Sequence, residues 1–161
     1  MDPAELEDRV AALEGRVRLL EDHVELLRLI NRWGPAVDTG DDEAAASLWT
    51  DDGVLESDLS RLDGPPEVAA MVRSDGQQSL IRQGCAHIQG FPVLSVQGDT
   101  AVAVGYSRVY RRRDDGHEVW RVSANRWEFR RTPSGWRVSR RTNHRIDGGP
   151  DAHVILRDAL G

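Results

Sequence analysis

An aspartate stands at a helix end that disfavours its charge. Asp38 lies in the last turn of a predicted helix, directly before Thr39-Gly40, where the helix macrodipole opposes an anion by about 0.3–1 kcal/mol. Ile30 and Gly34 share its helix face, so we expect the carboxylate to point toward the core, where it needs a partner. The alternative is an aspartate that only caps the turn that follows.

His87 is the natural partner for this carboxylate. It lies in the stretch Cys85–Gly90, which is predicted to be a strand. A histidine in such a strand is most often a hydrogen-bonded core residue. Beside a buried aspartate, however, it becomes a general base whose tautomer and orientation the carboxylate fixes. We therefore predict that Asp38 and His87 form a catalytic pair.

Other polar and aromatic side chains are candidates for binding a substrate. Ser123 and Asn125 are two residues apart and therefore share one face of a predicted strand. Trp127 and Phe129 follow on the same face and indicate that it points inward; the alternative is an ordinary solvent-facing position. Four further residues complete the predicted binding set: Trp33, Trp49, Tyr106 and His144.

The composition excludes several kinds of chemistry. All 21 basic residues are arginine, and without lysine the chain lacks the residue for Schiff-base catalysis, a P-loop or pyridoxal phosphate. The histidines have no metal-ligand spacing, and Cys85 is the single cysteine, so neither a metal knuckle nor an internal disulfide is expected. We predict no metal and no cofactor.

The charge pattern and hydropathy bear on partners and location. Twelve arginines stand against four acids between positions 108 and 145, a pattern that nucleic-acid-binding proteins also show. These arginines mostly alternate with apolar residues, as outward-facing strand positions do, and the net charge is −6. No apolar run approaches the roughly 20 residues of a membrane span, and the acidic N-terminus is unlike a secretory signal. We predict a cytoplasmic protein that binds neither nucleic acid nor membrane.

Residues 1–27 have the pattern of a coiled coil. Apolar residues recur at alternating steps of four and three, with valine at a and leucine at d, which favours a parallel two-stranded coil. Arg9 and Arg16 at g would face Glu14 and Glu21 at e of a parallel partner. We predict a homo-oligomer, a dimer in preference to a trimer; the alternative is an amphipathic helix lying on its own domain. The seam consists of Leu6, Val10, Leu13, Val17, Leu20, Val24 and Leu27.

Residues 28–148 are predicted to form one α+β domain, followed by a tail over 149–161. Helices precede a long antiparallel meander, so the helices should cover one face of a twisted, bent sheet that encloses a cavity. The expected elements are a first helix that Gly34-Pro35 kinks and Thr39-Gly40 ends, helices over 43–49 and 67–74, strands over 54–58 and 85–96, a loop over 59–66, and strands over 100–112, 117–131 and 136–146.

Several segments resemble SnoaL-like domains of the nuclear-transport-factor-2-like superfamily. The likeness covers roughly residues 24–147 and implies a cone-shaped, cystatin-like α+β fold. Its motifs are fairly specific for the fold and weakly specific for the reaction. They lie at Asn31–Asp41, Leu48–Gly53, Ala86-His87, Gly98–Ala101, Ser123–Asn125 and Gly135–Val138.

The characterised members that the chain resembles are scytalone dehydratase and the bile-acid dehydratases. By that resemblance, Asp38 and His87 are the acid–base pair, and Ser123 and Asn125 bind the substrate.

The chain also departs from these enzymes. Arginines at 111–113 occupy the stretch where scytalone dehydratase has a second histidine. Val37 stands where that enzyme has a tyrosine, and Trp33 lies near the position of a tyrosine in the bile-acid enzymes.

Three functions are compatible with these features. The first is a cofactor-independent lyase or isomerase, dehydratase-like, in which His87 moves a proton on a small cyclic substrate. The second is a non-catalytic module that binds a small molecule, and the third is an oligomer-building scaffold. An open pocket with Asp38 within hydrogen-bond reach of His87 favours the first, an open pocket with the pair apart favours the second, and a sealed pocket favours the third.

Overall fold

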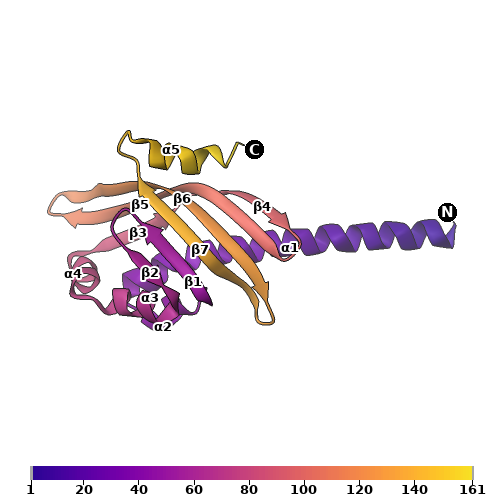
Figure 1. Ribbon diagram of the computed structural model, residues 1–161, viewed down its shortest axis with the longest axis horizontal. Helices are drawn as coiled ribbons and strands as arrows, with labels where there is room; N and C mark the ends of the chain where they lie inside the picture. Colours follow the sequence, from indigo (N-terminus) through magenta and orange to yellow (C-terminus); the bar gives the residue numbers. More distant parts are fainter. Residues whose placement is uncertain (1, 161) are drawn as a thin grey trace.

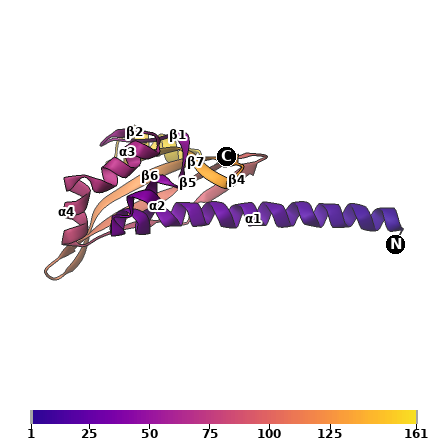
Figure 2. The same ribbon diagram turned by 90° about the horizontal axis from the view of Figure 1, so that it is seen from below.

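A single long helix opens the chain. The structure, a computed structural model, describes residues 2–160; Met1 and Gly161, the ends of the predicted segments 1–27 and 149–161, lie outside that range. Helix α1 (Pro3–Thr39) continues through Pro35 and ends at Gly40, which has the left-handed φ of 74°. Figures 1 and 2 show its N-terminal part extending well beyond the rest of the molecule. None of the described helices is both long and apolar enough to cross a membrane.

The first contacts between α1 and the domain are polar. Asp22 accepts hydrogen bonds from the Trp136 indole at 2.9 Å and from the Arg131 guanidinium at 2.7 and 2.9 Å. Glu25 accepts the backbone N–H of Trp136 at 2.8 Å. From Leu26 onward, one face of α1 is buried. The domain therefore holds α1 from about Asp22, slightly before the predicted boundary.

Three short helices follow in the first half of the chain. Helix α2 (Asp42–Ala46) begins as predicted at Asp41, whose carboxylate accepts the N–H of Ala44 at 2.9 Å. It ends earlier than predicted, because Trp49 already belongs to a strand. The expected third helix is two helices, α3 (Gly64–Arg73) and α4 (Asp75–Gln83), and Ser74 caps the second.

The strands form one curved sheet, as the meander predicts. Its order is β2-β1-β7-β6-β5-β3, and β4 pairs with the other half of β5. All pairs are antiparallel except β1 with β7. The strand expected over 85–96 is interrupted around Pro92, and a short strand lies in the region expected to be a loop. The bounds are β1 Trp49–Ser57, β2 Arg61–Asp63, β3 Cys85–Gln89, β4 Val93–Gln97, β5 Thr100–Arg113, β6 Gly116–Thr132 and β7 Gly135–Arg145.

A bulge in β7 reverses the predicted alternation of its side chains. Val138 pairs with Phe129 and Arg140 pairs with Glu128, so Ser139 is the extra residue. One extra residue moves all later side chains to the opposite face. Arg141 and Asn143 therefore point inward. The prediction that the arginines between positions 108 and 145 face outward is wrong for two of them, Arg141 and, on β6, Arg121, because each is only 6% exposed.

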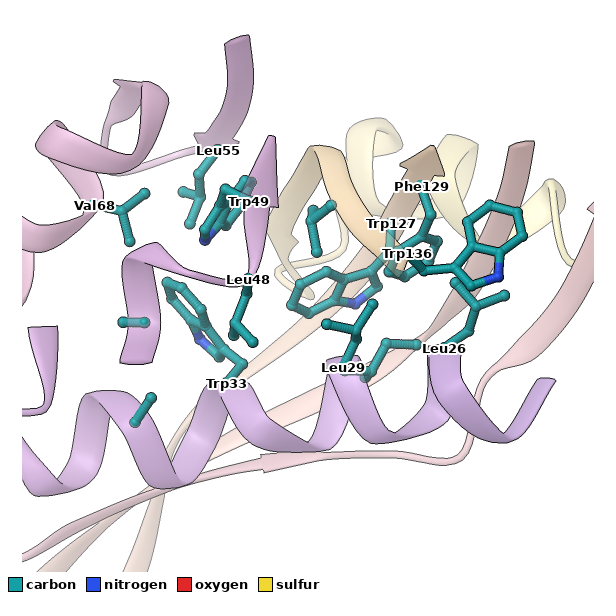
Figure 3. Packing of buried hydrophobic residues seen from close by; sticks show 14 of the residues in the cluster. Leu26, Leu29, Trp33, Leu48, Trp49, Leu55, Val68, Trp127, Phe129 and Trp136 are labelled. Atoms are coloured by element: carbon teal, nitrogen blue, oxygen red, sulfur yellow. The ribbon is translucent and has the colours of Figure 1, made fainter. Parts of the chain in front are cut away.

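Helices cover both faces of the sheet, unequally. Helices α1 to α4 lie on the concave face, and α5 (Pro150–Arg157) lies on the other face (Figure 1). Figure 3 shows the main core between α1 and the sheet, where Leu26, Leu29 and Trp33 meet the aromatic residues of β6 and β7. On the far face, Ala152 and Ile155 of α5 form a smaller cluster.

The closest approach of α1 to the sheet is at a glycine. A Cβ atom built on Gly34 would lie 2.1 Å from the backbone oxygen of His87, well inside van der Waals contact. Only a residue without a side chain lets α1 cross β3 at this distance. Since Asp38 follows Gly34 by four residues, it lies on the same face of α1, one turn closer to the helix end.

We expect Gly34→Ala to destabilise the fold by about 1–3 kcal/mol, because the added methyl group collides with backbone that cannot turn aside. Denaturant titration followed by tryptophan fluorescence measures the loss. Gly15→Ala is the matched control: apart from its own stretch of helix, nothing in the described chain lies within 4 Å of a Cβ built there. It should stabilise the helix by about 0.5–1 kcal/mol. Equal stability of wild type and Gly34→Ala would contradict the close contact.

Candidate active site

The structure brings Asp38 and His87 into direct contact. The Oδ1 atom of Asp38 lies 2.5 Å from Nδ1 of His87, and both side chains are largely buried, 18% and 17% exposed. The second carboxylate oxygen accepts the backbone N–H of His87 at 2.7 Å. The carboxylate thus hydrogen-bonds both the ring and the main chain of His87, which fixes the orientation of the imidazole.

Cys85 is the third member of this cluster. Its thiol donates to Oδ1 of Asp38 at 3.3 Å. Burial, and then the hydrogen bond to Asp38, raises the pKa of the Cys85 thiol from 9.0 to about 12. The atoms of Asp38, Cys85 and His87 that could ligate a metal ion lie within 4.8 Å of one another. A metal held by this group would require Cys85 as the thiolate; in this structure Cys85 acts as a hydrogen-bond donor to Asp38.

The electrostatics of Asp38 favour its charged form. Burial by itself would raise the pKa of this carboxyl. Hydrogen bonds from the ring and the backbone N–H of His87 outweigh burial, and the net effect is a pKa below the ordinary 3.8. At neutral pH, Asp38 is therefore an acceptor, so Nδ1 of His87 is the donor and Nε2 is the atom available as a base.

His87 lies at the wall of a cavity of about 210 Å³ between the sheet and helices α1, α3 and α4. Within the described chain, Nε2 of His87 makes no hydrogen bond. Most of the cavity surface is apolar, and among its lining residues are Trp33, Leu62, Met71, Leu80, Val109 and Trp120. Nε2 of His87 is not among the fully buried polar atoms that lack a partner, so it stays accessible on a residue that lines a largely apolar space.

A polar network forms one wall of the same cavity. Oδ1 of Asn125 accepts from Nε and Nη2 of Arg141 at 3.0 and 2.8 Å and from Nδ2 of Asn143 at 2.7 Å. Nδ2 of Asn125 donates to Ser107 at 2.7 Å. Arg121 donates to Asn143 at 2.9 Å and pairs with Asp58. Asn125 thus organises the side chains that reach the cavity.

The predicted binding residues fall into four groups. Trp33 lines the cavity. Ser123 and Asn125 point inward, as predicted, but are 1% exposed and lie behind the lining residues; no hydrogen bond satisfies the Ser123 hydroxyl among the described residues. Trp49 is a core residue packed against Trp33, with ring centroids 5.9 Å apart.

Tyr106 and His144 lie outside the site. Both residues pair with Ala124 of β6, Tyr106 from β5 and His144 from β7. Ala124 belongs to the cluster that α5 covers, on the far face of the sheet. Regular alternation along β7 would put His144 on the same face as Trp136 and Val138, but the bulge at Ser139 moves it to the far face. Tyr106 is half exposed and lines a groove beside α5.

Sequence reasoning missed the side chains that form the polar wall, namely Ser107, Arg121, Arg141 and Asn143. One signal was present for Arg121, since it shares the alternating face of Ser123 and Asn125. No signal of this kind exists for Arg141, whose inward position depends on the bulge.

The curved sheet with a cavity beneath a helical cover places the chain in the nuclear-transport-factor-2-like class of cystatin-like α+β proteins. A crystal structure of such a protein from Novosphingobium aromaticivorans matches with a TM-score of 0.87 and 43% sequence identity, over 89% of this chain and 94% of that one. The chain belongs to the SnoaL-like domain family, whose model matches residues 18–142.

More distant structures share the fold alone. A hexachlorocyclohexane dehydrochlorinase from Novosphingobium barchaimii matches with a TM-score of 0.70 at 16% identity, over 81% of this chain and 90% of that one. A protein of unknown function from Mycobacterium tuberculosis matches with a TM-score of 0.69 at 20% identity, over 88% and 90%. A search of curated proteins finds no match.

Asp38→Asn should change how stability responds to acid. Because the folded state lowers the pKa of Asp38 below 3.8, the carboxylate stabilises the fold above that pH, and this contribution is lost as the pH falls through the lower, folded value. Urea titrations of wild type and variant should show a stability difference that shrinks as the pH drops below 3.8. A difference that stays constant through this acid range would argue against the contact.

Proposed function

We propose that the chain is an enzyme that transfers protons without a cofactor, a lyase or isomerase acting on a small cyclic, largely apolar substrate. The observation that carries the proposal is the 2.5 Å contact between Asp38 and Nδ1 of His87. It leaves the other ring nitrogen without a hydrogen bond among the described residues, on a side chain that lines the cavity. A neutral imidazole held in one tautomer by a buried carboxylate is a positioned general base.

The first step removes a proton from a carbon beside a carbonyl group. Nε2 of His87 takes the proton, and the electron pair of the broken C–H bond moves onto the carbonyl oxygen to give an enolate. Asp38 stabilises the imidazolium that forms, as a buried aspartate does for catalytic histidines elsewhere.

The second step returns that proton. In an isomerisation, the enolate takes it back at a different carbon. In a dehydration, the enolate electrons expel a hydroxyl group from the β-carbon, and the imidazolium protonates the departing oxygen as water. Both outcomes leave His87 neutral and need no oxidant or reductant, which is compatible with the side chains that line the cavity.

The cavity supports a substrate of one ring or slightly more. Its volume of about 210 Å³ is below the roughly 300–1,000 Å³ of sites for drug-sized ligands. The apolar lining provides burial, and positioning in a site of low water content supplies the part of the rate that acid–base chemistry does not. A dehydrochlorinase among the structural neighbours shows that a protein of this fold carries an elimination activity.

The catalytic proposal is tested with a panel of cyclic ketones in D₂O, since enolate formation exchanges the α-proton whatever the natural substrate is. Mass spectrometry or NMR measures deuterium incorporation into cyclohexanone, 2-cyclohexenone and 3-hydroxycyclohexanone. We expect wild type to accelerate exchange of at least one ketone, and His87→Gln to lose about 10²–10⁴-fold of that rate.

His117→Gln is the matched control, because His117 is an exposed histidine at the start of β6, away from the cavity. It should exchange at the wild-type rate. If His87→Gln incorporated deuterium into the ketone at the full wild-type rate, His87 would not be the catalytic base. Saturable binding of a ketone with no exchange would instead support the binding-module alternative.

A further inference from the structure

Arg141 is a buried cation that has no carboxylate partner among the described residues. Its side chain is 6% exposed, and the groups that surround its guanidinium are the neutral Asn125 amide and the faces of Trp127 and Trp33, whose ring centroids lie 4.2 and 5.1 Å away. A buried charge without a counter-ion is costly. Burial, and then the nearby Arg121 charge, lowers the pKa of Arg141 to about 9, so at neutral pH the cation persists.

The guanidinium is not fully used by the protein. Nε and Nη2 donate to Asn125, whereas Nη1 makes no hydrogen bond with the described part of the chain. Nη1 is also absent from the set of fully buried polar atoms that lack a partner, so it retains some accessibility. Since Arg141 lines the same cavity as His87, donor capacity remains on the cavity side of this residue.

The charges around the cavity do not compensate Arg141. No acidic side chain is among the described residues that line it, although Arg108, Arg121 and Arg141 are. The pair with Asp58 neutralises Arg121, and His87 stands between the cavity and Asp38. The cavity therefore has a largely apolar lining and carries uncompensated positive charge at buried Arg141 and at exposed Arg108.

From this arrangement we propose that Arg141 binds a negatively charged oxygen of the ligand, a carboxylate or an enolate- or phenolate-type oxygen on a small ring. Asn125 is a positioning residue: it accepts hydrogen bonds from two nitrogens of the guanidinium and holds that group over the faces of Trp33 and Trp127. The proposal deepens the proposed function, because an enolate formed by His87 is such an oxygen, but anion binding at Arg141 does not itself require that His87 be catalytic.

The test is equilibrium binding of benzoate, with benzamide as its uncharged counterpart of the same shape. Trp33 and Trp127 beside Arg141 make intrinsic fluorescence the readout. We expect wild type to bind benzoate at least about tenfold more tightly than benzamide, since a charge-assisted hydrogen bond is lost with the amide. Arg141→Gln should abolish this preference, and Arg140→Gln, which removes the same charge from a residue paired with Glu56 outside the cavity, should keep it.

Asn125→Asp guards against a folding defect in Arg141→Gln. It keeps the guanidinium and the side-chain shape but supplies an internal carboxylate, so it should also lose the preference for benzoate. His87→Gln should retain it, which separates this proposal from the catalytic one. The proposal is overturned if wild type shows no saturable benzoate binding, if benzamide binds equally well, or if folded Arg141→Gln and Asn125→Asp both bind benzoate as wild type does. A 4-nitrophenol titration distinguishes phenolate from carboxylate binding, because bound phenolate changes the absorption spectrum.

An independent observation concerns the N-terminal part of α1. Six of the seven predicted seam residues are 46–65% exposed: Leu6, Val10, Leu13, Val17, Leu20 and Val24. At 3.6 residues per turn, this stripe lies on the side of α1 opposite to Leu26, Leu29, Ile30 and Trp33, which pack on the domain. The domain therefore leaves the seam open, and two copies can pair along it with their domains on the outer sides.

We infer that the seam binds a second copy of this chain in a parallel, two-stranded coiled coil. The charges specify the orientation, because Arg16 at g lies opposite Glu21 at e only when the two helices are parallel. Open depressions lie between the exposed side chains of the stripe, one bordered by Val10, Leu13 and Val17 and one by Val17, Leu20 and Val24. These are the places where the partner side chains would insert.

Light scattering after size exclusion should give a dimer for wild type and a monomer for the double variant Leu13→Glu, Val17→Glu. Leu19→Glu is the control: Leu19 is 44% exposed but off the seam, so this variant should stay dimeric. Leu20→Cys should oxidise to a covalent dimer, because equivalent residues meet only in a parallel coil. A wild-type monomer or trimer, or failure of Leu20→Cys to crosslink in a dimer, would overturn the inference.

Discussion

The close crossing of α1 over β3 is the constraint on which the site depends. Gly34 lets the helix backbone reach the carbonyl of His87, and one turn later Asp38 meets both the ring and the backbone N–H of the same residue. The helix would otherwise have to stand away from the strand by the width of a side chain. The close packing that Gly34 permits is thus what allows the Asp38 carboxylate to hydrogen-bond the His87 imidazole at the cavity wall.

The sheet supplies the polar wall of the site, and it does so through a β-bulge that interrupts the regular pairing of β7 with β6. The bulge at Ser139 turns Arg141 and Asn143 toward the concave face, where regular alternation would have directed them outward. The side-chain oxygen of Asn125 accepts hydrogen bonds from both residues. The base and the cation come from different elements, α1 with β3 and β6 with β7, which lets packing fix each one separately around a shared apolar space.

The sequence predicted what depends on local pattern. The helix end at Gly40, the cap at Asp41 and the meander of long strands all follow from turn residues and alternation, and the family resemblance agrees with them. The Asp38–His87 contact was predictable because a carboxylate facing the core needs a partner. Arg141 was not predictable, because a single extra residue in β7 changes which side chains point inward and no turn signal marks it.

The central claim is that Asp38 holds His87 as the Nδ1–H tautomer with Nε2 free for chemistry, and ¹⁵N NMR of histidine-labelled protein tests it most directly. At a pH where the imidazole is neutral, the His87 signals, assigned by their loss in His87→Gln, should show a protonated Nδ1 and an unprotonated Nε2. Asp38→Asn should lose that bias. A wild-type His87 protonated at Nε2, or one with the tautomer mixture of a free imidazole, would contradict the account.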